Sequence, residues 1–170
     1  MAFCNILVTG TPGVGKTTFA EELAKSLQFT HINSTQLIKE HNFLESYDEK
    51  LDTHVLDEDK YLDELETIFG DSCSESHILD SHYCGLYPER WFQLVIVLRT
   101  DSDELAKRLQ ARNYNDLKLK ENLEAEIFQV ISDDAKESYK SDIILELPSN
   151  TTDDIENNIE KVTAWLREKY

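Results

Sequence analysis

Short runs of strand-forming residues alternate with longer amphipathic stretches along this chain. The short runs lie at residues 6–8, 30–33, 77–80, 94–98 and 143–147. Residues 94–98 are apolar without interruption, which is typical of a central strand covered on both faces. Strands that alternate with helices pair in parallel through crossover connections. The pattern therefore predicts an α/β fold with a five-stranded parallel sheet and helices on both faces, in one domain spanning residues 1–170.

The amphipathic stretches repeat apolar residues at intervals of three and four, as the buried face of a helix does. One follows residue 16, a short one is expected around residues 35–41, and another covers residues 61–69. Four apolar residues at intervals of four predict a single long helix: Leu119, Leu123, Ile127 and Ile131. Residues 42–57 are polar and poorly periodic, so we expect an exposed excursion there.

Two spacings mark helix starts near the end of the chain. Asp101 and Glu104 are spaced as a capping box, in which the two residues satisfy each other's free backbone amides. Thr151 and Asp154 have the same spacing ahead of a final amphipathic stretch. We therefore expect capped helices to begin at both places.

The segment after the first predicted strand matches the pattern G-x-x-x-x-G-K-[ST] at every position, from Gly10 to Thr17. Glycines permit backbone angles that are closed to other residues, and the amides that open the following helix attract an anion. Lys16 adds a full charge between the β- and γ-phosphates, and the Thr17 hydroxyl can ligate Mg²⁺. We therefore predict an ATP site that comprises Gly10, Gly13, Val14, Gly15, Lys16, Thr17 and Thr18.

Acidic residues outnumber basic ones two to one in this sequence. The 34 acidic and 17 basic residues give a formal net charge of −17. Such a surface repels phosphate backbones, so direct binding of nucleic acid is not expected. A basic protein is the favoured macromolecular partner, although the acidic residues can equally serve solubility alone. No stretch suggests a membrane span or signal peptide, and three cysteines without metal spacing fit a reducing compartment.

Further residues are placed by pattern to act on the phosphates. Asp80 ends a predicted strand, where a carboxylate can hold Mg²⁺ through water beside the Thr17 hydroxyl; an ordinary capping acid is the alternative. Arg108 and Arg112 are four residues apart on one helix face, and guanidinium groups there can neutralise a transferring phosphoryl group. For the two arginines the alternative is a solvated basic face.

The phosphate loop has the G-x-P-G-x-G-K form and the guanine-specific N-K-x-D element is absent, so the chain resembles nucleoside-monophosphate kinases. The pattern Asp80-x-His82, the run Tyr-Pro-Glu-Arg-Trp-Phe at 87–92 and the run Glu-Ile-Phe-Gln-Val at 126–130 narrow this resemblance to the adenylate kinase isoenzyme 6 family. The resemblance implies the strand order 2-3-1-4-5. It also implies an insertion near residues 33–57 for the acceptor nucleotide and a short lid near residues 111–121 that excludes water.

The same resemblance implies an enzyme that transfers the γ-phosphoryl group of ATP to AMP with Mg²⁺, and that also hydrolyses ATP. It implies contact of Arg112 with ATP and a catalytic role for His82, which by itself would be an ordinary packed or solvated residue. The residues expected to carry catalysis are Lys16, Asp80, His82 and Arg112.

The acceptor nucleotide is expected to meet Asn33, Ser34, Thr35 and Lys39. Here the chain departs from the family, which tends to carry Gly-Asp-Leu where this sequence has Thr-Gln-Leu at 35–37, and arginine where it has Lys39. Lysine lacks the bidentate fork of arginine, so weaker binding of AMP is expected.

Beyond catalysis, the resemblance implies residence in the nucleus and cytoplasm. It also implies a role in maturation of the small ribosomal subunit, through binding of a basic small-subunit ribosomal protein. We expect a monomer. The alternative is an ATPase switch that chaperones this ribosomal protein, with water rather than AMP as the usual acceptor. A small-metabolite kinase that uses the same loop is a third interpretation, because the fold does not decide the substrate.

Overall fold

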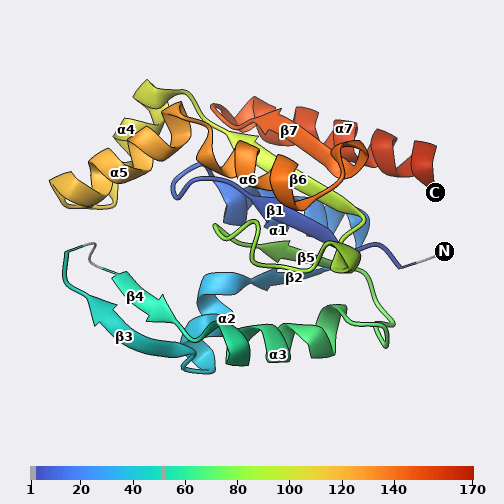
Figure 1. Cartoon of the computed structure of the whole chain (residues 1–170). Coiled ribbons are helices and arrows are strands. Elements are labelled where there is room, and N and C mark those ends of the chain that lie inside the picture. Colours follow the sequence, from blue (N-terminus) through green and yellow to red (C-terminus); the bar gives the residue numbers. More distant parts are fainter. Residues whose placement is uncertain (1–2, 51–52) are drawn as a thin grey trace.

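A five-stranded parallel sheet lies at the centre of the protein, with helices on both of its faces (Figure 1). The computed structural model describes residues 3–50 and 53–170. The strand order is β2-β5-β1-β6-β7. When the strands of this sheet are numbered along the chain, that order is 2-3-1-4-5, so the predicted topology is confirmed. The five strands are β1 (Ile6–Thr9), β2 (Thr30–Asn33), β5 (His77–Asp80), β6 (Leu94–Arg99) and β7 (Ile144–Pro148).

The two faces of the sheet bury separate sets of apolar side chains, because neighbouring residues of a strand point to opposite sides. Ile6 and Val8 pack against α1 (Lys16–Leu27), α4 (Ser102–Ala111) and α7 (Thr152–Lys169). Leu7 instead joins residues of α2 (Ser34–Glu40), α3 (Glu58–Phe69) and α6 (Val130–Ser138). Short 3-10 turns occupy Glu89–Trp91 and Ser141–Ile143. Within the described residues, no helix is both long and apolar enough to span a bilayer.

The two predicted capping boxes have different outcomes. At α7 the Thr151 hydroxyl accepts from the Asp154 amide and the Asp154 carboxylate accepts from the Thr151 amide, as predicted. At α4 the prediction is wrong, because the Asp101 side chain makes no capping hydrogen bond. The reason is competition: the Asp101 amide donates to Asn150 Oδ1 at 2.8 Å, and Glu104 accepts from Arg108 Nε at 3.0 Å.

The predicted long helix is also wrong, because the chain forms two helices, α5 (Asp116–Ile127) and α6, with a sharp turn between them. Gln129 takes the left-handed conformation, with φ of 58°. Leu119 and Leu123 pack on one face of the sheet, whereas Ile131 packs on the other. Residues that serve two opposite cores cannot share one helix face, so the four-residue interval misled the prediction.

Residues 42–57, predicted as an exposed excursion, contain an antiparallel hairpin. It comprises β3 (Leu44–Asp48) and β4 (Thr53–Leu56), and an irregularity between Leu44 and Ser46 interrupts its register. That irregularity breaks the alternation by which a strand is recognised in sequence. In Figure 1 the hairpin and α5 extend from the same side of the molecule.

Candidate active site

The loop between β1 and α1 has the backbone geometry of a phosphate cradle. Gly10 has φ of 154°, and a side chain there would meet the backbone oxygen of Leu98 at 2.8 Å. Gly15 has φ of 90° and stands at the start of α1, where no side chain caps the helix. The free amides of that first turn therefore face the cavity in front of the loop, which is the arrangement that binds an anion.

Lys16 folds back over this loop. Its Nζ donates to the carbonyl oxygens of Gly10 at 2.9 Å and Thr11 at 3.2 Å. Burial lowers the pKa of Lys16 to about 8, while the nearby carboxylate of Asp80 opposes that shift. A phosphate oxygen at this position would replace the carbonyl partners and would restore the preference for the charged ammonium.

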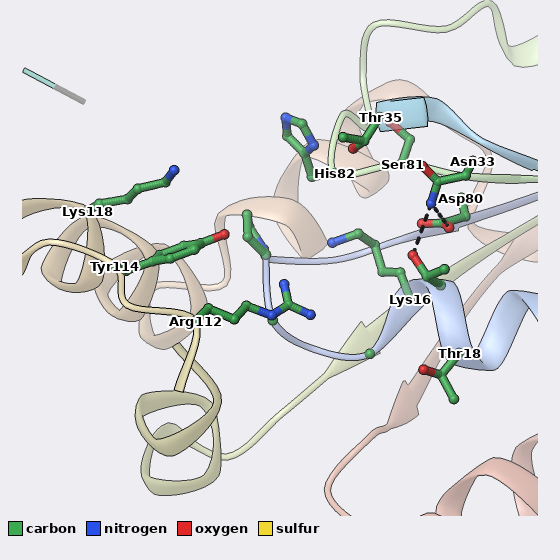
Figure 2. Close-up of a pocket in the computed structure, with 14 residues that line it drawn as sticks. Lys16, Thr18, Asn33, Thr35, Asp80, Ser81, His82, Arg112, Tyr114 and Lys118 are labelled. Carbon is green, nitrogen blue, oxygen red and sulfur yellow. Dashed lines mark hydrogen bonds between the residues drawn. The ribbon is translucent and has the colours of Figure 1, made fainter. Parts of the chain in front are cut away.

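Asp80 and Thr17 are joined through one amide. Asn33 Nδ2 donates to Asp80 Oδ2 at 2.7 Å and to Thr17 Oγ1 at 3.1 Å (Figure 2). Asn33 stands opposite Asp80 in the pairing of β2 with β5, and its Oδ1 caps α2 by accepting from the Gln36 amide. A carboxylate and a hydroxyl are hard oxygen donors, so Thr17 and Asp80 fit the preference of Mg²⁺ for oxygen ligands.

His31 is a neighbour of Asp80 that the sequence did not single out. Its Nε2 lies 3.2 Å from Asp80 Oδ2, and only 4% of the Asp80 side chain is exposed. The two-residue interval between His31 and Asn33 on one strand places both side chains on the same face of the sheet. That interval was the available signal, and it becomes informative only when Asp80 is known to lie beside this strand.

A cavity of about 370 Å³ lies in front of the loop. Ten residues proposed from sequence line it, from the loop, β2, β5 and the end of α4: Gly13, Gly15, Lys16, Thr17, Thr18, Asn33, Thr35, Asp80, His82 and Arg112. Pro12, Ser81, Tyr114 and Lys118 line it as well. Of the other proposed residues, Ser34 is fully buried and Lys39 is exposed, and neither is part of this lining.

A second cavity, of about 510 Å³, shares Gly13, Gly15, Thr18 and Arg112 with the first. Arg108 lines this second cavity and not the one in front of the loop. Its Nη2 donates to the Asn150 carbonyl at 3.0 Å. Arg112 is the residue after α4 and contacts both cavities. The two cavities are therefore neighbours, with Arg112 and the loop in the wall of both.

His82 follows the end of β5 and packs its ring on Tyr83, with the ring centroids 4.2 Å apart. Burial lowers the pKa of His82 to about 4, and the charge of Lys16 adds to this effect. The imidazole is therefore neutral at pH 7 and can accept or donate one hydrogen bond without adding charge. In Figure 2 His82 and Arg112 lie on opposite sides of Lys16.

The start of α5 adds two residues to the cavity wall. Lys118 Nζ lies 4.4 Å from the centroid of the Tyr114 ring, a distance at which the cation is attracted to the ring face. In the sequence alone, Tyr114 could either stack on adenine or pack within the lid, with no basis to choose. Here it does line the cavity and also packs against the core, while Lys118 had no motif to mark it.

Glu126 connects the far end of α5 to the phosphate loop. Its side chain is 4% exposed and accepts from Thr11 Oγ1 at 2.6 Å and from Arg99 Nε at 2.6 Å. The Thr100 amide also donates to it, at 3.2 Å. A buried carboxylate therefore holds the loop and the helix behind the proposed lid in one network, which no local sequence pattern indicated.

Comparison with known proteins agrees with this geometry. A model of the AAA domain family matches residues 6–129. The chain is 45% identical over 166 residues to the adenylate kinase isoenzyme 6 homolog of Dictyostelium discoideum, covering 98% of this chain and 93% of that protein. It is also 45% identical over 158 residues to the homolog of Caenorhabditis elegans, covering 93% of this chain and 86% of that protein.

Among solved structures, the shikimate kinase from Bacteroides thetaiotaomicron matches with a TM-score of 0.59 at 16% identity. The match covers 98% of this chain and 99% of that chain. At this identity the likeness concerns the fold alone, and it agrees with a kinase fold built around a phosphate loop.

Proposed function

The chain belongs to the adenylate kinase isoenzyme 6 family, and from this premise we propose that it transfers the γ-phosphoryl group of ATP to AMP and also hydrolyses ATP. One observation carries the proposal. Three cationic side chains, Lys16, Arg112 and Lys118, line one cavity with the neutral polar groups of Asn33 and Thr35. A polyphosphate and a second, smaller phosphorylated ligand would thus meet across this space.

The donor nucleotide would extend over both cavities. Its β- and γ-phosphates would lie on the loop amides and Lys16, and its nucleoside would occupy the second cavity beside Arg108 and Thr151. Arg112 contacts both spaces, so its guanidinium is placed to neutralise the charge that develops during transfer. In-line transfer needs positioning and charge stabilisation and no covalent intermediate with the protein.

Mg²⁺ would be held by the Thr17 hydroxyl and, through water, by Asp80. When bound, the metal ion supplies positive charge to the β- and γ-phosphate oxygens. The contribution of this chain is the orientation of the two oxygen donors, because the Asn33 amide bonds both of them. His31, bonded to the same carboxylate oxygen, fixes Asp80 further.

The acceptor would enter from the side of α2 and the hairpin, within the proposed insertion at residues 33–57. Residues 111–121, with Tyr114 and Lys118, would act as the lid. Hydrolysis is the second activity, with His82 as the group that orients the attacking water. The observation that favours it is a neutral imidazole on the cavity wall, near Lys16.

We also propose a role in maturation of the small ribosomal subunit, in the nucleus and cytoplasm, through a basic ribosomal protein. The net charge of −17 supports a basic partner and disfavours nucleic acid. If that role dominates, ATP hydrolysis would serve as a switch for release of the bound protein.

One assay separates transfer from hydrolysis. Purified protein is incubated with Mg·ATP, with and without AMP, and ADP and free phosphate are followed together. With AMP, we expect ADP to accumulate in excess of the phosphate released. Without AMP, we expect ADP and phosphate to be released together, more slowly than ADP forms with AMP. Phosphate release that is indifferent to AMP, with ADP never exceeding the phosphate released, would overturn the kinase proposal and leave the switch.

A further inference from the structure

Four hydroxyl groups form a continuous hydrogen-bonded chain inside an otherwise apolar core. Ser34 Oγ lies 2.7 Å from the Tyr61 hydroxyl, which lies 2.9 Å from the Tyr87 hydroxyl. Tyr87 in turn donates to Ser81 Oγ at 2.6 Å. All four residues are buried, and none is more than 4% exposed. The chain joins the start of α2, where the acceptor is proposed to bind, to the segment that follows Asp80.

The protons of this chain can be counted, because each hydroxyl carries one. Burial raises the pKa of Tyr61 and raises that of Tyr87 well above its usual value, so both phenols stay protonated. Tyr87 uses its proton on Ser81, so the bond between the two tyrosines needs the proton of Tyr61. Ser34 must then donate to Tyr61. All the hydrogen bonds therefore run in one direction, from Ser34 toward Ser81.

The last hydroxyl in the chain retains a proton of its own. Ser81 Oγ accepts from Tyr87 and also from the Tyr83 amide at 3.0 Å. Among the residues that the structure describes, no group accepts the Ser81 proton. Ser81 lines the phosphate cavity between Asp80 and His82, and Figure 2 shows it beside Thr35 and Asn33.

We propose that Ser81 is a substrate-binding residue whose hydroxyl donates to a phosphoryl oxygen in the cavity. Tyr87 and Tyr61 are positioning residues: Tyr87 donates to the Ser81 oxygen and Tyr61 donates to Tyr87, so the Ser81 proton is left for the ligand. This role rests on the phosphoryl transfer proposed above. The phosphoryl oxygen belongs either to the monophosphate acceptor or to the terminal phosphate of ATP.

A hydrogen bond to a charged oxygen is stronger than one between neutral groups, and donors in a chain polarise one another. Loss of the Ser81 hydroxyl should therefore weaken binding of the contacted substrate by at least about tenfold, the lower end of the range for hydrogen bonds to charged groups. Loss of the Tyr87 hydroxyl leaves Ser81 in place but removes its fixed orientation. Binding of the same substrate should then weaken about threefold.

The test compares Ser81→Ala and Tyr87→Phe with the unchanged protein. Tyr139→Phe is the matched control, because Tyr139 is also a buried tyrosine, and its hydroxyl donates to backbone carbonyls, those of Cys84 at 2.7 Å and Tyr87 at 3.4 Å, and to none of the four hydroxyls. The measurements are kcat, the KM values for AMP and ATP, and calorimetric Kd values for AMP and a non-hydrolysable ATP analogue. Thermal unfolding checks that each variant is folded.

A rise confined to the AMP constants assigns the contact to the acceptor, and a rise confined to the ATP constants assigns it to the terminal phosphate. We expect Tyr139→Phe to change neither the AMP constants nor the ATP constants. Ser81→Thr should retain most of the affinity because it keeps the hydroxyl. The inference is overturned if Ser81→Ala leaves all the binding constants unchanged, or if Tyr87→Phe and Tyr139→Phe change them equally.

The test remains decisive if one variant does not fold or if the protein does not phosphorylate AMP. If Ser81→Ala does not fold, Tyr87→Phe against Tyr139→Phe carries the comparison. If the unchanged protein does not phosphorylate AMP, the proposed transfer reaction fails. The calorimetric titrations still decide the role of Ser81, because they need no turnover.

Discussion

The two sides of the phosphate cavity use different chemistry. The loop and the lid contribute cations, Lys16, Arg112 and Lys118, together with the amides at the start of α1. The opposite side contributes the Asp80 carboxylate, which is placed for the metal ion, and neutral groups, of which Asn33 and Ser81 are held by hydrogen bonds to other side chains. We infer that charge holds the donor polyphosphate, whereas the acceptor is selected by hydrogen bonds with fixed direction.

The same contrast appears in how each side is built. The phosphate loop of the donor side is one contiguous segment, whose glycines permit the required backbone. The acceptor side combines separate elements, which must be held at the correct distance by contacts such as the bonds of Asn33 to Thr17 and Asp80. A change on the donor side should therefore abolish both phosphoryl transfer and hydrolysis. A change on the acceptor side should alter the affinity for AMP or the ratio of transfer to hydrolysis.

The largest effect is expected for Lys16→Ala. Removal of this charge should lower both phosphoryl transfer and hydrolysis by at least about a thousandfold, because the lysine acts on phosphates common to the two reactions. Turnover of Mg·ATP with and without AMP measures this. Lys25→Ala is the control, since Lys25 is exposed and paired with Glu22 on the surface. Unchanged turnover in the Lys16 variant would mean that the loop does not bind ATP.

Glu126→Gln should destabilise the donor side specifically. The substitution keeps the shape but leaves the Arg99 guanidinium without its 2.6 Å carboxylate partner, at a cost of about 3 kcal/mol in the free energy of unfolding. Binding of ATP should weaken more than binding of AMP, because Thr11 of the loop loses its acceptor. Denaturant unfolding and calorimetry measure the two effects. Glu146→Gln is the control, because Glu146 lies near the same arginine but is exposed and 3.8 Å away.

His82→Gly tests whether His82 acts in hydrolysis itself and not only in binding of ATP. We expect hydrolysis without AMP to fall by about a hundredfold, while the Kd for ATP changes less than about twofold. His41→Gly is the control, since His41 is exposed at the end of α2 and outside the cavity. Equal losses in hydrolysis and ATP binding would show that His82 supports the site only structurally.

Features formed by residues that are neighbours in the sequence could be predicted, whereas features formed by distant segments could not. The phosphate loop and the cap at Thr151 could be predicted because each depends on residues close in sequence, whereas the strand order was predicted only through the family resemblance. The cap at Asp101 could not, because Asn150 competes for its amide across 49 positions. The hydroxyl chain from Ser34 to Ser81 likewise exists only after α2, α3 and the loop that follows β5 are brought together, so no spacing in the sequence indicates it.

The pH dependence of ATP binding should distinguish the two sides further. In the free protein the pKa of Lys16 is about 8, and bound phosphates favour its charged form. Above pH 8 the lysine must therefore take up a proton on binding, so the affinity for ATP should fall, by at most about tenfold per pH unit. Calorimetry in two buffers of different ionisation enthalpy measures this uptake. AMP, if held by neutral groups, should bind without it.

The smallest effect is expected for Lys39→Ala. Lys39 is the basic residue proposed for the acceptor, but its side chain is exposed and does not line the cavity in the part of the chain that the structure describes. A single exposed charge screened by solvent contributes little, so the KM for AMP should rise by less than about twofold. Steady-state kinetics with varied AMP measures this, with Lys25→Ala again as the control. A tenfold rise would mean that α2 moves when AMP binds and brings Lys39 to the phosphate, in which case the acceptor side also uses charge.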